Sequence, residues 1–272
     1  SEYGPWTPPQ PYMKPRQPYR FGVYLQKELS SVTQPRVLLI GPVGAGKSSF
    51  FNSVNSVFRG HVTSQAISGS SSTSLTTQVF VWYGREGKPL PIILCDTMGL
   101  EESKGAGLDI DDLSSILKGH LPDRYQFNPS APLHSESHGY RTSPGLKDKI
   151  HCVAYVIDAS KVSIMPKGLE EKLDAIRIPQ LVLLTKVDEA CPLVKEDVRN
   201  VYKSGYIKDV EVGSRLGVPL SCIIPVKNYS EELELDMNCD ILLLSAVIQM
   251  FRFVDNYFDE LSDRISNMQT KD

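Results

Sequence analysis

The chain has 272 residues, of which 41% are hydrophobic and 22% are charged, and its formal net charge is −3. These values are ordinary for a globular protein and exclude a global charge argument for binding nucleic acid or an anionic membrane, so no nucleic-acid partner is expected. The five cysteines are odd in number and have no CxxC spacing, which predicts buried free thiols and a cytoplasmic location.

One domain is the simplest organisation for this length. Residues 1–34 form a proline-rich N-terminal extension, which is either a linker or a recognition motif for a proline-binding module. The core domain is expected at 35–265, with an irregular segment at 119–149 and a tail at 266–272. Because no signal-peptide pattern and no uninterrupted run of about eighteen apolar residues is found, no transmembrane segment is expected.

The most informative stretch runs from residue 36 to residue 51 and reads RVLLIGPVGAGKSSFF. An apolar strand at 37–40 leads into a turn that matches G-x-x-x-x-G-K-[ST], and a helix at 48–58 follows. In such a turn, glycines let backbone N–H groups surround a phosphate, and the helix N-terminus adds partial positive charge. The lysine can reach the β- and γ-phosphates, and the serine hydroxyl can ligate Mg²⁺.

A glycine-rich surface turn is the alternative, but the strand before it and the helix after it favour phosphate binding. Lys47 is also the expected catalytic cation. The residues of the loop that we expect to contact nucleotide are Gly41, Val43, Gly44, Ala45, Gly46, Lys47, Ser48 and Ser49.

The next segment, residues 60–77, is rich in serine, threonine and glycine and precedes a strand at 78–83. A nucleotide-sensing switch would have to lie here, between the phosphate loop and the next strand. We expect Thr76, with Thr77 close behind, to contact Mg²⁺ and the γ-phosphate, which makes Thr76 the second expected catalytic residue beside Lys47.

An apolar run at 90–95 ends in Asp96-Thr97-Met98-Gly99. A carboxylate at the end of a buried strand beside a phosphate loop can hold the Mg²⁺ shell, and Gly99 can offer its N–H to the γ-phosphate. The predicted metal ligands are therefore Ser48, Thr76 and Asp96. A mobile second switch and a helix near 109–118 should follow.

The segment at 119–149 has no period and is either an insertion or a functional surface. Metal binding by His134 and His138 is not expected, since no third ligand is near. A strand at 150–157 should be buried on both faces, with Asp158 as a capping or turn residue and a helix at 166–177.

Another buried strand at 181–184 ends in Thr185-Lys186-Val187-Asp188. A carboxylate held rigidly after a strand can accept both the N1–H and the exocyclic N–H₂ of guanine, a pair of donors that adenine lacks. Lys186 can lie over the base, and Thr185 can fix the loop. An ordinary strand-to-helix turn with a capping aspartate is the weaker alternative.

The remaining chain predicts a helix at 195–204, a strand at 221–226 and a loop in which Asn228 can contact the base. Apolar residues at 244, 248, 251, 254, 258, 261 and 265 predict a helix over 240–265. This helix either packs along the sheet or forms an interface with a second copy or a partner.

The order GPVGAGKS, Thr76, DTMG and TKVD resembles the five-motif arrangement of small guanine-nucleotide-binding domains. Longer runs, such as GPVGAGKSSFFNSVNSVFRGHVTSQA and SPGLKDKIHCVAYVIDAS, make residues 35–265 similar to the interferon-induced protein 44 and 44-like family. The resemblance implies an α/β P-loop NTPase fold, with a mostly parallel, doubly wound sheet. It also implies a cytosolic, interferon-inducible protein that binds GTP or GDP with Mg²⁺ and is linked to antiviral defence. The proline-rich start departs from family members that carry another domain upstream.

Two further departures concern the site. Leu100 stands where many signalling GTPases place a glutamine that orients water, and Thr185 stands where asparagine is more common. The sequence therefore predicts a slow GTPase switch that associates with itself or with a host signalling protein. The alternatives are a non-hydrolysing scaffold that modulates innate immune signalling and, third, a P-loop ATPase or nucleotide kinase.

Overall fold

The computed structural model describes residues 32–63, 78–83, 89–96, 110–122, 135–137, 139–161, 178–205, 207 and 219–269. Several predicted features lie outside these residues. They are the chain before residue 32, the switch residues Thr76, Thr77 and Gly99, as well as Leu100, His134, His138 and the helix at 166–177.

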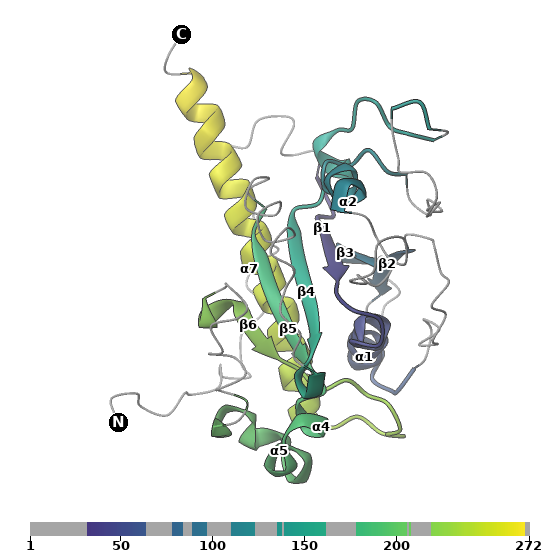
Figure 1. The fold of residues 1–272 in the computed structure, drawn as a ribbon, viewed down its shortest axis with the longest axis vertical. Helices are drawn as coiled ribbons and strands as arrows, with labels where there is room; N and C mark the ends of the chain where they lie inside the picture. The colour runs from purple at the N-terminus through teal and green to yellow at the C-terminus, as the bar shows by residue number, and fades with distance from the viewer. Residues whose placement is uncertain are drawn as a thin grey trace.

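A six-stranded sheet forms the centre of the described structure, in the order β2-β3-β1-β4-β5-β6 (Figure 1). Among these strands, β2 runs antiparallel to β3, whereas the other neighbouring pairs are parallel. The prediction of a mostly parallel α/β sheet is therefore confirmed. The strands are β1 (Arg36–Ile40), β2 (Gln78–Tyr83), β3 (Pro89–Asp96), β4 (Cys152–Asp158), β5 (Gln180–Thr185) and β6 (Ile223–Pro225).

The central strands are apolar except at their ends, because both faces of the sheet are covered. Every residue of β4 is buried, as predicted, and so are the last four of β1. Alternate side chains serve separate cores: Val37 and Leu39 of β1 belong to one cluster, and Leu38 and Ile40 belong to the other.

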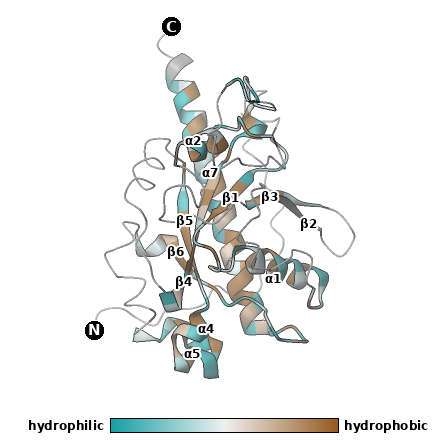
Figure 2. Cartoon of the chain, turned by 45° about the vertical axis from the view of Figure 1, so that its right-hand side comes forward, coloured by the Kyte–Doolittle hydropathy of each residue, from teal (hydrophilic) through white to brown (hydrophobic). Residues whose placement is uncertain are grey.

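Helices lie on both faces of the sheet, which makes the fold doubly wound. Side chains of α1 and most of the buried residues of α7 join the core on the Val37 side, whereas α2, α4 and α5 contribute to the core on the Leu38 side. Figure 2 shows hydrophobic segments on the strands and on the part of α7 beside them. The helices are α1 (Lys47–Arg59), α2 (Ile110–Leu117), α4 (Val187–Ala190), α5 (Pro192–Glu196) and α7 (Met237–Gln269), and the 3₁₀ turns are η2 (Leu146–Asp148), η3 (Ala159–Lys161), η4 (Val198–Tyr202) and η5 (Leu220–Cys222).

The long helix α7 packs along the sheet and extends into the predicted tail. Its predicted apolar stripe is right in the second half, where Val254 and Phe258 are buried, but wrong in the first half. There Leu243 and Val247 face the core, and Ile248 is exposed. The C-terminal end of α7 projects beyond the strands (Figure 1).

The same helix also bears on the expectation that no segment crosses a membrane. Within the described residues, Met237–Asn267 is long and apolar enough to cross a membrane by length and composition alone. The indication is weak because core helices pass the same test, and the buried face of α7 packs on the protein core.

Two predicted elements are wrong in detail. Residues 195–204 do not form one helix, because Asp197 is extended (φ −151°) and its carboxylate accepts the N–H of Arg199, which ends α5 and begins η4. Val194 of α5 and Val201 of η4 are both buried, although the extended Asp197 separates their turns. The predicted strand at 221–226 is shorter, because η5 occupies its start.

The described part of the irregular segment is organised around Arg141. Its Nη1 donates to the carbonyl oxygens of Gly119 (2.8 Å) and Leu121 (3.3 Å) and lies 3.5 Å from an Asp148 carboxylate oxygen. The ring of His120 stacks on Tyr140, with centroids 4.8 Å apart. These contacts fix residues 139–148 against the end of α2.

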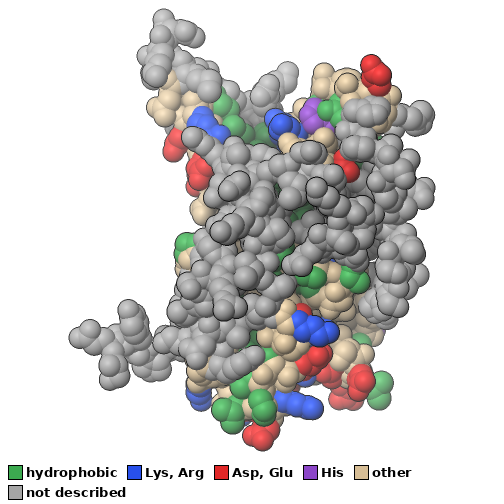
Figure 3. All heavy atoms as spheres, in the orientation of Figure 1, with side chains coloured by type: hydrophobic (Ala, Val, Ile, Leu, Met, Phe, Trp, Pro, Cys, Tyr) green, Lys and Arg blue, Asp and Glu red, His purple; other side chains and the backbone are tan. Residues whose placement is uncertain are grey.

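The cysteines are free, as predicted: four are buried and Cys222 is half-buried. On the face shown in Figure 3, acidic, basic and hydrophobic side chains are interspersed at the end of the molecule formed by α4 and α5. Leu193 and Tyr202, from α5 and η4, are among the exposed hydrophobic residues.

His151 is fully buried between β1 and α7. Its Nδ1 accepts the N–H of Arg36 (2.8 Å), so its Nε2 donates to the carbonyl oxygen of Leu146 (3.0 Å). The ring also packs against Tyr257 and Phe258. Burial and the neighbouring Arg36 charge lower the pKa of His151 from 6.5 to about 4, although the hydrogen bond to Leu146 opposes this shift.

This buried imidazole predicts a loss of stability in mild acid. Between pH 6.5 and pH 4 the unfolded chain binds a proton that the folded chain excludes, so stability falls as pH falls through this window. From pH 7 to pH 5 the cost is about 2 kcal/mol. Urea unfolding at both pH values should show that His151→Asn reduces this dependence, whereas a matched change at exposed His61 keeps it. Equal pH dependence in the wild type and His151→Asn would contradict the assignment.

Candidate phosphate and base site

The phosphate-loop candidate follows β1 at the carboxyl edge of the sheet. β1 lies between β3 and β4, so the chain fills one side of β1 first and then crosses to the other. In open α/β sheets, ligands bind at such a switch point, outside the carboxyl ends of the strands. Asp96 and Thr185 end the parallel strands β3 and β5 at the same edge.

Glycines give the loop its shape, and close packing against backbone also requires glycine at Gly41. Gly41, Gly44 and Gly46 have φ values of 153°, 77° and 95°. A Cβ atom on Gly41 would lie 2.2 Å from the carbonyl oxygen of Val156, and one on Gly46 would lie 2.9 Å from Nδ2 of Asn228. The loop is therefore seated directly on β4 and on the loop after β6.

The Lys47 side chain folds back across the same loop. Its Nζ donates to the carbonyl oxygens of Gly41 (2.9 Å) and Pro42 (3.0 Å), and the residue is 8% exposed. Burial lowers the pKa of Lys47, while the negative charge of Asp96 acts in the opposite direction. A desolvated ammonium group thus lies beside backbone that is shaped for an anion.

Ser48 and Asp96 bring two oxygen-bearing side chains together beside this ammonium group. The Ser48 hydroxyl donates to Asp96 Oδ2 (3.0 Å), and Asp96 is 8% exposed. Hydroxyl and carboxylate oxygens are the ligands that Mg²⁺ takes in proteins, so the donor set fits this ion. Both residues were predicted as metal ligands, and the structure brings them into contact.

Thr185 connects the phosphate loop with the base-recognition candidate. It is fully buried, and its hydroxyl lies 2.6 Å from the carbonyl oxygen of Ala45 and 3.0 Å from that of Ile157, so one proton serves both acceptors. Threonine, at a position where asparagine is more common, therefore makes a hydrogen bond from the end of β5 to the phosphate loop. Asn228 adds a second link, because its Nδ2 donates to the carbonyl oxygen of Gly46 (3.2 Å).

Lys186 has a left-handed backbone, with φ 56° and ψ 36°, which is uncommon for a residue other than glycine. Its Nζ forms a 2.9 Å ion pair with Asp158 Oδ2, and Asp158 Oδ1 accepts the N–H and hydroxyl of Ser160. Burial would raise the pKa of Asp158, but the bonds from Ser160 and Lys186 outweigh it and lower this pKa. Asp158 is thus the predicted turn residue, and it also orients Lys186.

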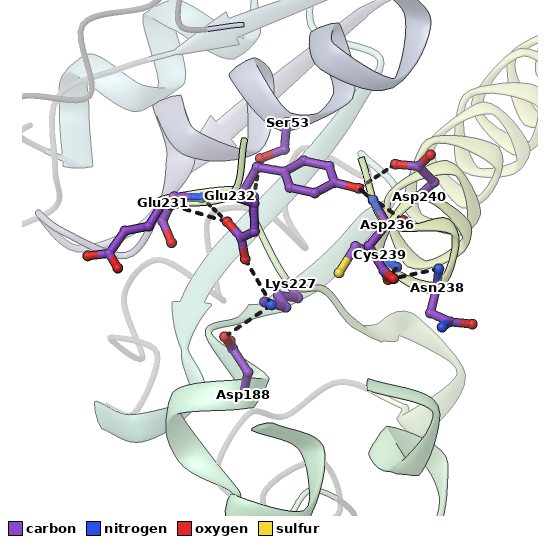
Figure 4. Close-up of polar contacts among 11 residues, drawn as sticks. Ser53, Asp188, Lys227, Glu231, Glu232, Asp236, Asn238, Cys239 and Asp240 are labelled. Atoms are coloured by element: carbon purple, nitrogen blue, oxygen red, sulfur yellow. Dashed lines mark hydrogen bonds and ion pairs between the residues drawn. The ribbon is translucent and has the colours of Figure 1, made fainter. Parts of the chain in front are cut away.

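Asp188 lies on the short helix α4, two residues after Lys186 and beside the loop that follows β6. Its Oδ2 lies 3.8 Å from Nζ of Lys227, which also forms a 2.9 Å ion pair with Glu232 (Figure 4). The two acidic residues therefore share one ammonium group. The structure places Asp188 and the loop of Asn228 side by side, as the prediction of base recognition requires.

Tyr229 secures that loop to two helices. Its N–H donates to Ser53 Oγ of α1 (2.8 Å), and its hydroxyl accepts the N–H of Asp236 (2.7 Å) and donates to Asp240 Oδ1 of α7 (2.7 Å). Burial raises the pKa of Tyr229, and the Asp240 hydrogen bond adds to this effect. The phenol therefore remains protonated and keeps donating.

The structure gathers most of the predicted site. The loop from Gly41 to Ser49 lies with Asp96, Thr185, Lys186, Asp188 and Asn228 at one edge of the sheet, although Thr185 is buried beneath the loop. Thr76 and Gly99 lie outside the described residues. Sequence reasoning missed the supporting roles of Ser53, Lys227, Tyr229 and Glu232. A partial signal was the mixture of charged and aromatic residues directly after the last strand.

Comparison with two human proteins supports the family resemblance that the sequence motifs predict. The chain is 45% identical to Interferon-induced protein 44-like from Homo sapiens, over 85% of this chain and 54% of the relative. It is 43% identical to Interferon-induced protein 44 from Homo sapiens, over 88% of this chain and 57% of the relative. The resemblance to this family is confirmed, and the chain spans about half the length of these relatives.

Among solved structures, a dimerization-deficient mutant of Toc33 from Arabidopsis thaliana matches with a TM-score of 0.41 and 16% identity, over 85% of this chain and 86% of that one. The family model described as 50S ribosome-binding GTPase matches residues 36–186, which is more than half of the chain. This chain is therefore a member of that GTPase family.

Proposed function

We propose that this chain is a Mg²⁺-dependent GTP-binding domain with slow hydrolysis, which acts as a nucleotide-gated switch in an interferon-induced antiviral response. The hydrogen bond from Thr185 to the carbonyl oxygen of Ala45 carries the proposal, because it joins the phosphate loop directly to the loop of the candidate guanine reader. The proposed role in an interferon-induced response rests on the similarity to Interferon-induced protein 44-like and Interferon-induced protein 44.

Each residue in the proposed site has a separate task. Backbone N–H groups of the loop and Lys47 bind the phosphates, and Ser48 with Asp96 hold Mg²⁺. Bound Mg²⁺ would neutralise charge on the phosphate oxygens. Lys186 lies over the base, and Asp188 accepts two N–H donors from guanine, which disfavours adenine. Thr76 and Gly99 are the proposed contacts to the γ-phosphate.

Slow hydrolysis follows from Leu100, which has no polar atom with which to orient water. A second candidate function, a nucleotide-binding scaffold without hydrolysis in innate immune signalling, rests on the same residue. The two functions differ in whether phosphate is released.

Calorimetry with GTP, GDP and ATP in the presence of Mg²⁺, together with single-turnover phosphate release, tests this proposal. We expect both guanine nucleotides to bind, ATP to bind about 100-fold more weakly, and phosphate to be released at about 10⁻³ s⁻¹ or more slowly. Equal binding of ATP and GTP would refute guanine recognition, and bound GTP that is never cleaved would favour the scaffold. Molecular mass measured in each nucleotide state reports self-association.

A further inference from the structure

The ammonium group of Lys227 is shared unequally between two carboxylates. Its Nζ lies 2.9 Å from Glu232 Oε1, within hydrogen-bond distance, but 3.8 Å from Asp188 Oδ2. Figure 4 shows Lys227 between these side chains. Glu232 therefore has the closer contact, and Asp188 has only a long ion pair.

Glu232 is itself anchored to the backbone of its loop. Its Oε2 accepts the N–H groups of Ser230 (2.8 Å) and Glu231 (3.1 Å), which leaves Oε1 directed at Lys227. Partial burial would raise the pKa of Glu232, but the Ser230 N–H and the Lys227 ammonium group outweigh it and lower this pKa to about 2. The residue is therefore a fixed negative charge at neutral pH.

The backbone on both sides of Lys227 is also fixed. The N–H of Val226 donates to the carbonyl oxygen of Leu184 (2.8 Å), and the N–H of Tyr229 donates to Ser53 Oγ (2.8 Å). The Lys227 backbone is thus held in place, and its ammonium group lies within reach of two carboxylates. The side chains of Lys227 and Asp188 are only 20% and 24% exposed, which limits screening of their attraction by water.

We infer that Glu232 is a positioning residue for base recognition: it holds the Lys227 ammonium group off Asp188 and leaves the Asp188 oxygens available to a base edge with two N–H donors. This inference rests on the proposed function, in which Asp188 reads guanine. Without the Glu232 charge, Lys227 would move onto Asp188 and compete with the base for the same oxygens.

A Glu232→Gln variant tests this role, because glutamine has the same size and its amide oxygen can still accept the two backbone N–H groups. Binding of GDP, IDP and ADP is measured by calorimetry with Mg²⁺. IDP lacks the exocyclic amine and offers one of the two donors, so the ratio of IDP to GDP dissociation constants reports the two-donor contact. We expect GDP binding to weaken about tenfold and this ratio to fall toward one.

Two further variants separate positioning from general damage. Glu234→Gln makes the same chemical change in the same loop at an exposed side chain that has no hydrogen bond or ion pair with the described residues, and it should leave the ratio unchanged. Adding Lys227→Met to Glu232→Gln removes the competing ammonium group and should restore the ratio. Thermal unfolding without nucleotide shows that each variant is folded.

The results distinguish the inference from the function on which it rests. Wild-type protein that binds GDP no better than ADP would overturn both. A wild-type preference for GDP that persists in Glu232→Gln, with an IDP-to-GDP ratio within twofold of the original, would overturn the inference alone. Failure of the double variant to recover selectivity would also overturn it, because competition by Lys227 would then not be the cause.

Discussion

Replacing Lys47 with alanine should weaken GTP and GDP binding about 100-fold or more and abolish any phosphate release. Lys47 is the buried cation of the phosphate loop, and its ammonium group spans the carbonyl oxygens of Gly41 and Pro42. A phosphate bound in this loop would meet the Lys47 ammonium charge, which water barely screens. Removing this charge therefore weakens nucleotide binding more than removing a surface lysine would.

Calorimetry and single-turnover hydrolysis measure the Lys47→Ala effect, and Lys118→Ala at the exposed end of α2 is the matched control. Unfolding of the nucleotide-free variants shows whether the loop survives the change. A folded Lys47→Ala protein that binds GTP within threefold of wild type would show that the phosphates bind elsewhere.

Replacing Asp188 with asparagine should change which base is preferred. The carboxylate can accept two N–H donors from guanine, whereas an asparagine amide offers one acceptor and one donor group. Xanthine carries a carbonyl oxygen where guanine carries the amine, so it suits the amide better. We expect GDP to bind about 100-fold more weakly and XDP to bind more tightly than it does to wild type.

Competition between GDP, XDP and ADP in the wild type and Asp188→Asn measures this change. Glu189→Gln, on the adjacent residue of α4, is the control for altered charge near the site. An unchanged order of preference would assign base selection to another residue, such as Asn228.

The central fold was predictable because local signals and burial agree there. Strands β1, β4 and β5 are apolar except at their ends, and a sheet covered on both faces requires this pattern. The prediction of one helix over 195–204 was wrong because Asp197 has an extended backbone and caps the next turn, which breaks the helix after Glu196. On α7, apolar residues occur on more than one face, so spacing alone selected Ile248 rather than Val247 in its first half.

The site was predictable for residues that belong to a recognisable sequence motif. Ser48 and Asp96 meet because Ser48 lies in the first turn of α1 and Asp96 ends β3 at the same edge of the sheet. The roles of Lys227 and Glu232 were not predictable, since they depend on how the loop after β6 turns back toward α4. Thr185 was expected to fix its own loop, and its buried hydroxyl also supports the phosphate loop from beneath, a contact that spacing along the chain does not predict.

The two links that hold the phosphate loop have a kinetic consequence. Thr185 bonds the carbonyl oxygen of Ala45 and Asn228 bonds that of Gly46, so both links join protein groups and neither involves the nucleotide. The loop therefore need not fold around an arriving phosphate, and little ordering entropy is lost on binding. Capture of nucleotide should be fast and similar for related nucleotides, so differences in affinity between GTP, GDP and ATP should reside in how long each remains bound.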